Sequence, residues 1–396
     1  MKNVPKLRFK GFSDEWENRK VGEFLTESRI PGNSGSIAKK LTVKLWAKGV
    51  VPKKEIYEGS DNTKYYIRRA GQLMYGKLDF LNCAFGIVPE ELDGYESTLD
   101  APAFDIKNIN SYFLLNKIIQ KDFYKKNGET ANGSRKAKRI HTDVFLDMEI
   151  KVPSLDEQKK IANFLTKIDK LIEKQDQKVN KLEQYKKGMM QKIFSQEIRF
   201  KKDDGGEYPE WEEKLLGVVS DVRDGTHDSP QYLEEGYPLI TSKNLNSNGK
   251  LDIKNVNYIS SVDFESINKR SKVDIGDILF GMIGTIGNPV LVNTNNFAIK
   301  NVALIKEKER LKNTYLIHYL NSEYISKQFY KTNAGGTQKF IALNLIRALS
   351  IHVPCLEEQN KIANFLSKID SIVEKEKEKL EELREWKKGL LKGMFV

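Results

Sequence analysis

The chain has 396 residues, with 66 Lys and Arg against 55 Asp and Glu, which gives a formal net charge of +11. This length predicts two or three folded cores, and the basic excess favours a polyanionic partner. Cys83 and Cys355 are the only cysteines, which excludes a disulfide framework and a cysteine-rich zinc site, and no apolar run is long enough to span a membrane. We expect a cytoplasmic protein without a secretory signal.

Residues 1–152 are expected to form a first globular α/β domain. Its basic and amide side chains lie on turn-forming sequence, where loops can contact DNA phosphates and bases. The candidates are Lys39, Lys40, Lys53, Lys54, Arg68, Arg69, Asn132, Ser134, Arg135, Lys136, Lys138 and Arg139. A solvated surface explains any single pair of these cations equally well, so the run around Arg135 is the strongest signal.

A long helix is predicted at 153–196. Pro153 ends a short alternating strand, and Asp156 and Glu157 suit a helix N-terminus. Apolar residues then recur at alternating spacings of four and three, as in a coiled coil. The seam contains Ile161, Leu165, Ile168, Ile172, Val179 and Leu182. From Asp156 to Phe194 such a helix is about 58 Å long, which exceeds one turn of duplex DNA.

Residues 197–353 are expected to form a second globular α/β domain. Turns rich in Gly, Ser and Asn alternate there with apolar runs that resemble β-strands. The candidate DNA contacts on these turns are Thr226, His227, Ser242, Lys243, Asn244, Asn246, Thr337, Gln338 and Lys339. Loops on a rigid scaffold often carry recognition groups, although the same residue types also simply make turns.

A second long helix is predicted at 354–396, and it repeats the first. Residues 147–194 and 348–395 align without a gap at a constant offset of 201, which relates Pro153 to Pro354 and Gly188 to Gly389. The second seam contains Ile362, Leu366, Ile369, Val373, Leu380 and Leu383. We therefore predict an α+β protein, in which two globular domains are joined by two long helices that form an antiparallel coiled coil with a pseudo-twofold internal repeat.

The polar positions of the two seams indicate a register for this coiled coil. Pairing Lys186 with Glu376 also pairs Gln175 with Lys387, because both pairs of residue numbers add up to 562. The alternative to a coiled coil is that each amphipathic helix packs on its own globular domain. That alternative explains one such helix better than two matched ones.

No catalytic motif is found. The sequence contains no phosphate-binding GxxxxGK[ST] loop, no HExxH, no GxSxG and no amino-methyltransferase motif of the DPPF or NPPY type. The four histidines lie far apart in sequence. We therefore expect no catalytic residue, no metal site and no cofactor in this chain.

The order of these parts resembles the specificity subunit of type I restriction-modification systems. The resemblance rests on the P-x-L-x-E-Q-x-K-I-A element at 153–162 and again at 354–363, on GDILF at 276–280 and on GGTQKFI at 335–341. The first domain departs from this pattern, because it has Ala70-Gly71-Gln72-Leu73-Met74-Tyr75 where the second has the fuller Gly276-led motif.

This resemblance implies that each domain reads one half of a split double-stranded DNA target and that the helices set the gap. It also implies two methyltransferase subunits that bind S-adenosylmethionine, and restriction subunits that use ATP and Mg²⁺. The alternatives are a coiled-coil scaffold that binds proteins without DNA specificity, and an unrecognised nuclease or methyltransferase. Added salt separates the DNA-reading subunit from the protein-binding scaffold, because DNA affinity falls steeply with salt.

Overall fold

The computed structural model describes residues 4–54, 60–129, 139–284, 286–332 and 340–396. Contacts between residues group the chain into two units. Unit 1 consists of Met1–Asp176 together with Glu378–Val396, and unit 2 consists of Gln177–Lys377. Each unit therefore contains one globular part and a piece of each of the two long helices.

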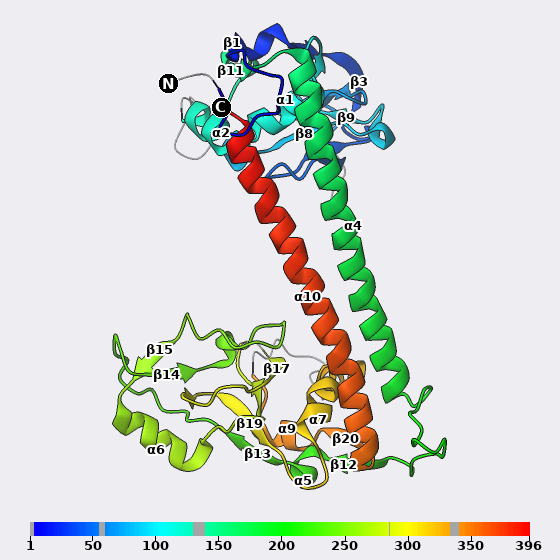
Figure 1. Cartoon of the computed structure of the whole chain (residues 1–396), viewed down its shortest axis with the longest axis vertical. Coiled ribbons are helices and arrows are strands. Elements are labelled where there is room, and N and C mark those ends of the chain that lie inside the picture. Colours follow the sequence, from blue (N-terminus) through cyan, green and yellow to red (C-terminus); the bar gives the residue numbers. More distant parts are fainter. Residues whose placement is uncertain (1–3, 55–59, 130–138, 285, 333–339) are drawn as a thin grey trace. The chain divides into compact units, whose positions relative to one another are not determined.

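The globular part of unit 1 mixes strands with short helices (Figure 1). Its strands are β1 (Glu17–Lys20), β2 (Leu25–Ser28), β3 (Ile30–Ser34), β4 (Leu41–Val43), β5 (Val50–Pro52), β6 (Lys64–Ile67), β7 (Leu73–Tyr75), β8 (Phe85–Ile87), β9 (Glu96–Ser97), β10 (Ala103–Ile106) and β11 (Glu149–Val152). Its helices are α1 (Ser111–Ile118), α2 (Lys121–Gly128) and α3 (Thr142–Asp147), with 3-10 turns η1 (Val21–Glu23), η2 (Phe80–Asn82) and η3 (Glu90–Leu92). The central antiparallel sheet has the order β2-β10-β7-β8, beside the smaller sheets β3-β6-β9, β1-β11 and β4-β5.

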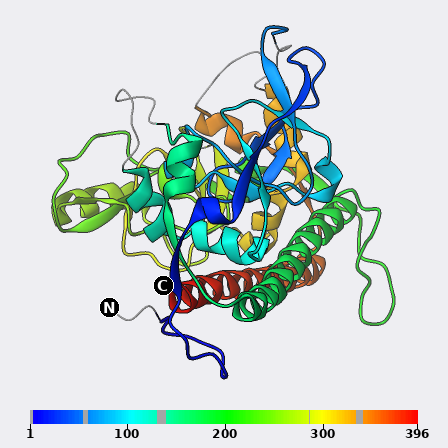
Figure 2. The ribbon, with the colours of Figure 1, turned by 90° about the horizontal axis from the view of Figure 1, so that it is seen from above.

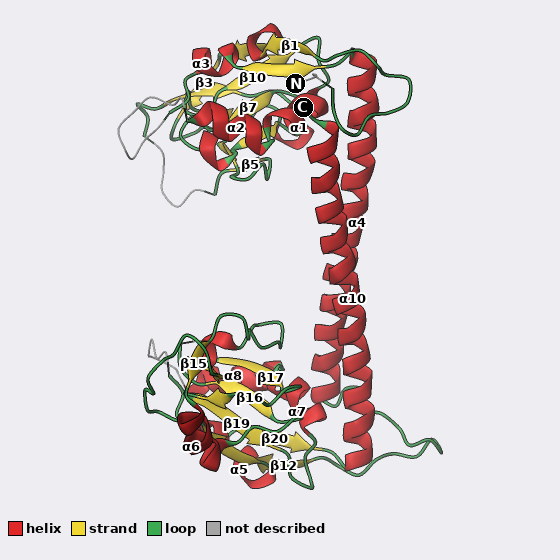
Figure 3. Ribbon diagram, turned by 60° about the vertical axis from the view of Figure 1, so that its left-hand side comes forward, coloured by secondary structure: helices red, strands yellow, loops and turns green. Residues whose placement is uncertain are grey.

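Unit 2 repeats this plan. Its strands are β12 (Glu212–Leu215), β13 (Asp221–Asp224), β14 (Tyr237–Ile240), β15 (Asn257–Ile259), β16 (Ile278–Gly281), β17 (Gly287–Leu291), β18 (Ala298–Ile299), β19 (Val302–Lys306) and β20 (Ser350–Val353). Its short helices are α5 (Leu216–Val219), α6 (Ser261–Ser271), α7 (Asn313–Leu320), α8 (Glu323–Thr332), α9 (Leu343–Arg347) and the 3-10 turn η4 (Ser242–Asn244). The central antiparallel sheet β13-β19-β16-β17 (Figure 3) corresponds strand by strand to that of unit 1, and β12-β20 corresponds to β1-β11. The repeat in sequence is thus a repeat in fold.

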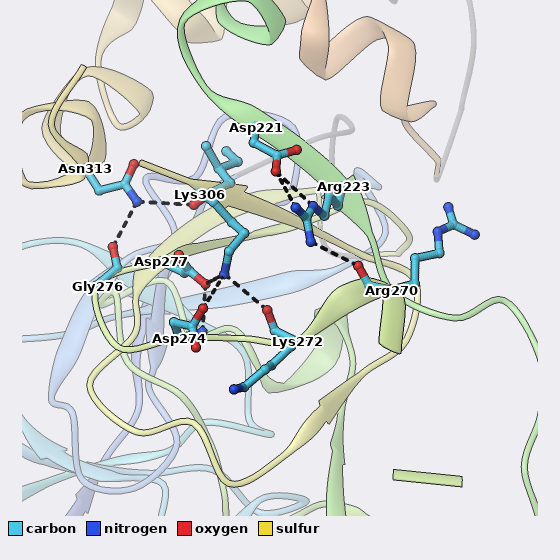
Figure 4. Close-up of polar contacts among 10 residues, drawn as sticks. Asp221, Arg223, Arg270, Lys272, Asp274, Gly276, Asp277, Lys306 and Asn313 are labelled. Atoms are coloured by element: carbon cyan, nitrogen blue, oxygen red, sulfur yellow. Dashed lines mark hydrogen bonds and ion pairs between the residues drawn. The ribbon is translucent and has the colours of Figure 1, made fainter. Parts of the chain in front are cut away.

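The Gly276-led turn before β16 supports the central sheet of unit 2 (Figure 4). Gly276 has a φ of 92°, in the left-handed region that favours glycine. The next residue, Asp277, is buried and accepts hydrogen bonds from the Asp274 backbone N–H at 2.7 Å and from Lys306 Nζ at 2.6 Å. Because Lys306 is the last residue of β19, its ion pair with Asp277 links β19 to the turn at the start of the GDILF element, whose last three residues belong to β16.

Unit 1 contains the same turn with different side chains. Gly71 has a φ of 82°, and Gln72 takes the place of the aspartate. The Gln72 Oε1 accepts from the Arg69 backbone N–H at 2.9 Å, and its Nε2 donates to Asp105 Oδ1 on β10 at 2.8 Å. The Gln72 amide and the Asp105 carboxylate of unit 1 therefore take the places of the Asp277 carboxylate and the Lys306 ammonium of unit 2. This exchange accounts for Gln72 in the first half where the second half has Asp277.

The P-x-L-x-E-Q element begins each long helix and fastens it to the segment that opens the same half. Arg8 Nε and Nη2 donate to the Glu157 carboxylate at 2.8 and 2.7 Å. Arg199 makes the same bidentate contact with Glu358, at 3.3 and 2.9 Å. The two glutamate side chains are 2% and 0% exposed, so each needs its guanidinium to offset the cost of burial.

The glutamine of this element has a matching role in both halves. Gln158 Oε1 accepts from the Asn110 backbone N–H at 2.9 Å, and Gln359 Oε1 accepts from that of Lys312 at 2.8 Å. The Nε2 of each donates to the carbonyl of the proline five residues earlier, at 2.9 and 2.8 Å. Both glutamines are buried. The element is therefore a joint between helix and globular part.

Each long helix ends in the core of the unit to which its last residues belong. α4 (Leu155–Phe194) ends at Phe194, which is 1% exposed in unit 2 and contacts Tyr315 and Tyr319 edge-on, at centroid distances of 5.9 and 5.0 Å. Beyond the end of α10 (Leu356–Met394), Phe395 lies in unit 1 and stacks on Phe113 at 5.3 Å. Phe194 and Phe395 are related by the offset of 201, so equivalent residues of the repeat complete the cores of the two units.

The antiparallel pairing of α4 and α10 is confirmed in both units, and Figures 1 and 2 show the two helices side by side. Lys387 pairs with Asp169 at 2.5 Å in unit 1, and Lys186 pairs with Asp370 in unit 2. Both pairs of residue numbers add up to 556. The predicted register of 562 is therefore wrong, since Lys186 bonds Asp370 and Glu376 forms an ion pair with Lys178 at 3.0 Å.

The predicted seam faces inward along both helices. The buried members are Ile161, Leu165, Ile168, Val179, Ile362, Leu366, Ile369, Val373 and Leu380, and the half-buried members are Ile172, Leu182 and Leu383. In the part of the chain that the structure describes, no helix combines the length and the apolar character needed to cross a membrane.

Candidate nucleic-acid interface

A loop cluster forms at one edge of the central sheet in unit 2. The loop after β13 is held against the turn between β18 and β19, because Thr226 N–H donates to the Ile299 carbonyl at 3.0 Å and Asn301 N–H donates to the Thr226 carbonyl at 3.1 Å. Gly225 has no room for a side chain, since a Cβ there would lie 2.3 Å from the Ile299 carbonyl oxygen. Close backbone packing therefore requires glycine at position 225.

Ser242 joins further loops to this cluster. Its buried Oγ donates to the Asn301 carbonyl at 3.0 Å and accepts from the backbone N–H groups of Met282 and Ile283 at 3.0 and 3.2 Å. The Ser242 hydroxyl is therefore occupied by hydrogen bonds to backbone groups inside the protein. The prediction of Ser242 as a DNA contact is corrected by this burial.

Asn244 is corrected for the same reason. It is 5% exposed, its Oδ1 accepts from Thr241, and its Nδ2 donates to the carbonyls of Asp252 and Asn255 at 3.2 and 2.9 Å. The amide thus shapes the loop that follows η4. Of the candidates on this loop, Lys243 and Asn246 are the exposed ones.

His227 is the exposed polar group at the centre of the cluster. Its Nδ1 lies 2.7 Å from Asn301 Oδ1 and its Nε2 lies 2.9 Å from Asp224 Oδ2, while its side chain is 55% exposed. Hydrogen bonds to Asn301 and then to Asp224 raise the pKa of His227 above its ordinary value of 6.5, against the lowering effects of desolvation and of Arg270. Two acceptors facing the two ring nitrogens favour a cationic imidazolium.

Sequence reasoning missed two residues of this cluster. Asn301, with a φ of 54°, bonds both His227 and Ser242, and Lys300 Nζ donates to Ser229 Oγ at 2.7 Å. Their signal is the Lys-Asn pair that interrupts an otherwise apolar run. Thr226, a predicted contact, is half-buried, and its Oγ1 accepts from the Asp228 backbone N–H.

In unit 1 the β4-β5 hairpin gathers lysines that are distant in sequence. Leu41 pairs with Pro52, and the Lys53 N–H donates to the Lys40 carbonyl at 2.9 Å, so both Lys-Lys pairs lie at the same end of the hairpin. Lys39, Lys53 and Lys54 are exposed there. Lys40 is 5% exposed, with its Nζ 5.6 Å from the centre of the Tyr65 ring, so it is withdrawn as a direct DNA contact.

The prediction for Arg68 is also corrected. Its side chain is fully buried, with Nε donating to Ser97 Oγ at 2.7 Å and Nη1 donating to the Ser28 carbonyl at 2.9 Å. Burial lowers the pKa of Arg68 to about 10. Arg69 is exposed and pairs with Asp93 at 3.3 Å.

Of the remaining candidates, one lies within the described residues and eight lie outside them. Arg139 is exposed and lies 3.7 Å from Asp100. Outside the described residues lie Asn132, Ser134, Arg135, Lys136, Lys138, Thr337, Gln338 and Lys339.

A second feature is repeated on the long helices. Leu171 and Trp386 are 51% and 48% exposed in unit 1, and Ile372 and Tyr185 are 49% and 53% exposed in unit 2. The two pairs are related by the offset of 201, and the residue numbers of each pair add up to 557, close to the 556 of the ion pairs Lys387–Asp169 and Lys186–Asp370. We call these the exposed apolar pairs. Sequence reasoning missed them because it followed the seam alone.

Comparison with known proteins gives a consistent result. A family model described as the type I restriction modification DNA specificity domain matches residues 101–184 and 208–385. The specificity subunit of the type I restriction enzyme MjaVIII from Methanocaldococcus jannaschii is 27% identical over 279 residues, which cover 63% of this chain and 62% of the relative. A second subunit from that organism, provisionally named for the enzyme MjaX, is 30% identical over 297 residues, covering 70% and 65%. The chain thus spans less than two thirds of the length of either curated relative.

Solved structures share the fold. The S subunit of a type I restriction-modification system from M. genitalium matches with a TM-score of 0.59 and 15% identity, covering 99% of both chains. A chain from a study of complex assembly and conformational transition of the type I system matches with a TM-score of 0.57 and 17% identity, covering 95% of this chain and 96% of the other.

Proposed function

Because the chain belongs to the family of type I restriction modification DNA specificity domains, we propose that it is the non-catalytic subunit that reads a DNA target in two parts. One observation carries the proposal. The central sheets of the two units have the same strand order, while the loops around them differ in sequence and in the side chains that they expose. Two globular parts with the same central sheet and different loops suit a DNA target whose two halves differ in sequence.

The exposed cations supply the general affinity for DNA. Lys53 and Lys54 in unit 1 and Lys243 in unit 2 can neutralise phosphates, which positions the protein without reading sequence. The amide of Asn246 can recognise adenine through paired hydrogen bonds in the major groove. Protonated His227 adds a cation whose position is set by Asn301 and Asp224. We propose that the bases are read by loops around these groups.

The long helices have two further roles in the proposal. They set the number of base pairs between the two half-sites, and they bind the catalytic partners. The two exposed apolar pairs support docking of two copies of one partner, because equivalent surfaces bind identical subunits. We propose two methyltransferase subunits there, with S-adenosylmethionine on those subunits, and ATP and Mg²⁺ on restriction subunits.

DNA binding is tested by titrating labelled duplexes with the full chain and its methyltransferase partner. Target DNA should bind at least a thousandfold more tightly than shuffled DNA. Lys53→Gln with Lys54→Gln should reduce the slope of log affinity against log salt by about 2, since each phosphate contact contributes about 1. Lys368→Gln, an exposed lysine on α10, is the matched control and should leave the slope unchanged. Equal binding of target and shuffled DNA would favour a protein-interaction scaffold and contradict the proposal.

Partner docking is tested by counting subunits. Trp386→Asp and Tyr185→Asp should each remove one of two methyltransferase copies from the assembled complex, measured by native mass spectrometry, and the double variant should remove both. The same Lys368→Gln variant should retain both. Full assembly by the double variant would show that the partners dock elsewhere.

A further inference from the structure

The apolar seam cannot by itself make α4 choose α10. The two helices carry apolar residues at the same repeat positions, and each ends in the same kind of core contact, made by Phe194 or by Phe395. Two copies of this chain could therefore pair α4 with α4 and α10 with α10 while burying similar surface. The seam therefore adds no preference of its own for the pairing within one chain.

Two of the ion pairs between the helices do not discriminate either. Lys186 with Asp370 and Lys387 with Asp169 are the same ion pair repeated, because the offset of 201 relates lysine to lysine and aspartate to aspartate. In a helix paired with its own copy, Lys186 would meet the Asp169 of the second chain. Attraction would be retained in every possible pairing.

Two other ion pairs behave differently under the repeat. Lys377 bonds Glu183 at 2.5 Å in unit 2, and Arg384 bonds Asp176 at 3.0 Å in unit 1. The offset relates Lys377 to Asp176 and Arg384 to Glu183, so each position has the opposite charge in the other copy. At these positions α4 carries two acids and α10 carries two bases.

We propose that these sign-reversed pairs make α4 bind α10 and disfavour pairing with the same helix of a second chain. In an α4–α4 pair, Asp176 would face the second chain's copy of Glu183 twice, and an α10–α10 pair would bring Lys377 and Arg384 together twice. The side chains are 45% to 49% exposed, so each pair acts in a partly screened setting. Such pairs change an equilibrium by about 1.4- to 5-fold each.

The proposal is tested by exchanging charges across each pair in the full chain. Glu183→Lys with Lys377→Glu keeps both ion pairs within the chain, yet it gives each helix one acid and one base and so permits self-pairing. Asp176→Arg with Arg384→Asp does the same through the other pair. Combining all four changes restores one sign per helix and disfavours self-pairing again.

Two differently tagged versions of each protein are unfolded together, refolded at low salt, and assayed by mass photometry for particles that contain both tags. The mixed fraction should rise roughly three- to tenfold over wild type in each two-residue exchange and return to the wild-type level in the fourfold variant. The rise should disappear at about 1 M salt, where the screening length is about 3 Å. Equal melting temperatures would show that no variant acts by unfolding.

The proposal is overturned if both two-residue exchanges give the wild-type mixed fraction. It is equally overturned if the fourfold variant stays as high as they do, because charge sign would then not control pairing. The two exchanges act at separate places, so if one variant does not fold, a wild-type mixed fraction in the other exchange overturns the proposal by itself.

Discussion

Phe194→Ala should destabilise unit 2, although Phe194 ends the helix that follows the first globular part in sequence. The ring is 1% exposed and meets Tyr315 and Tyr319 edge-on at 5.9 and 5.0 Å. Truncating a buried phenylalanine costs about 3–5 kcal/mol, and two aromatic contacts place this site in the upper part of that range. Phe395→Ala should have a smaller effect on unit 1, because Phe395 is 9% exposed.

Hydrogen–deuterium exchange shows which unit loses stability in each variant. In Phe194→Ala, protection should fall in α7 and the central strands β16 and β19, and the strands of unit 1 should keep their wild-type rates. In Phe395→Ala, protection should fall around α1 in unit 1. If Phe194→Ala instead loosened the strands of unit 1, the helix ends would be assigned to the wrong cores, and the packing described above would be refuted.

Three further effects follow from particular contacts. Lys306→Met leaves the buried Asp277 carboxylate without its cation and should lower the free energy of unfolding by about 1–3 kcal/mol in urea titrations; an unchanged value would contradict the turn's structural role. The pKa of His227 is raised, so its contribution to DNA affinity should be greatest at acid pH and fall as the pH rises through the raised pKa, a step that His227→Gln should abolish in binding titrations. Lys186→Glu should be rescued by Asp370→Lys with a coupling of about 0.2–1 kcal/mol in thermal unfolding, and additive effects would count against the observed register.

The repeat made the helices predictable. Limits of 153–196 and 354–396 were expected, and the helices run over Leu155–Phe194 and Leu356–Met394. The heptad also identified the residues that face inward. The register was predicted wrongly because it assumed that polar seam residues pair with each other. Lys186 instead reaches an acid beside the opposite seam, since a long flexible side chain need not bond directly across.

The candidate DNA contacts were less predictable, because a basic or polar residue type does not reveal whether the side chain is buried. Arg68 and Lys40 lie on turn-like sequence with other cations, yet strand pairing places both inside unit 1. Ser242 was chosen as a polar loop residue, but backbone groups from a distant strand occupy its hydroxyl. Contacts of this kind depend on long-range topology. By contrast, the exposure of Lys53 and Lys54 follows from their place beyond a short edge strand.

The most direct test of two-part reading is a map of methylated adenines in a host that carries this subunit with its methyltransferase. The map should give one target made of two defined half-sites separated by a fixed gap. Replacing residues 20–150 with the corresponding segment of a relative should change one half-site and leave the other half-site and the gap unchanged. A change in both half-sites, or a single continuous target, would contradict the account.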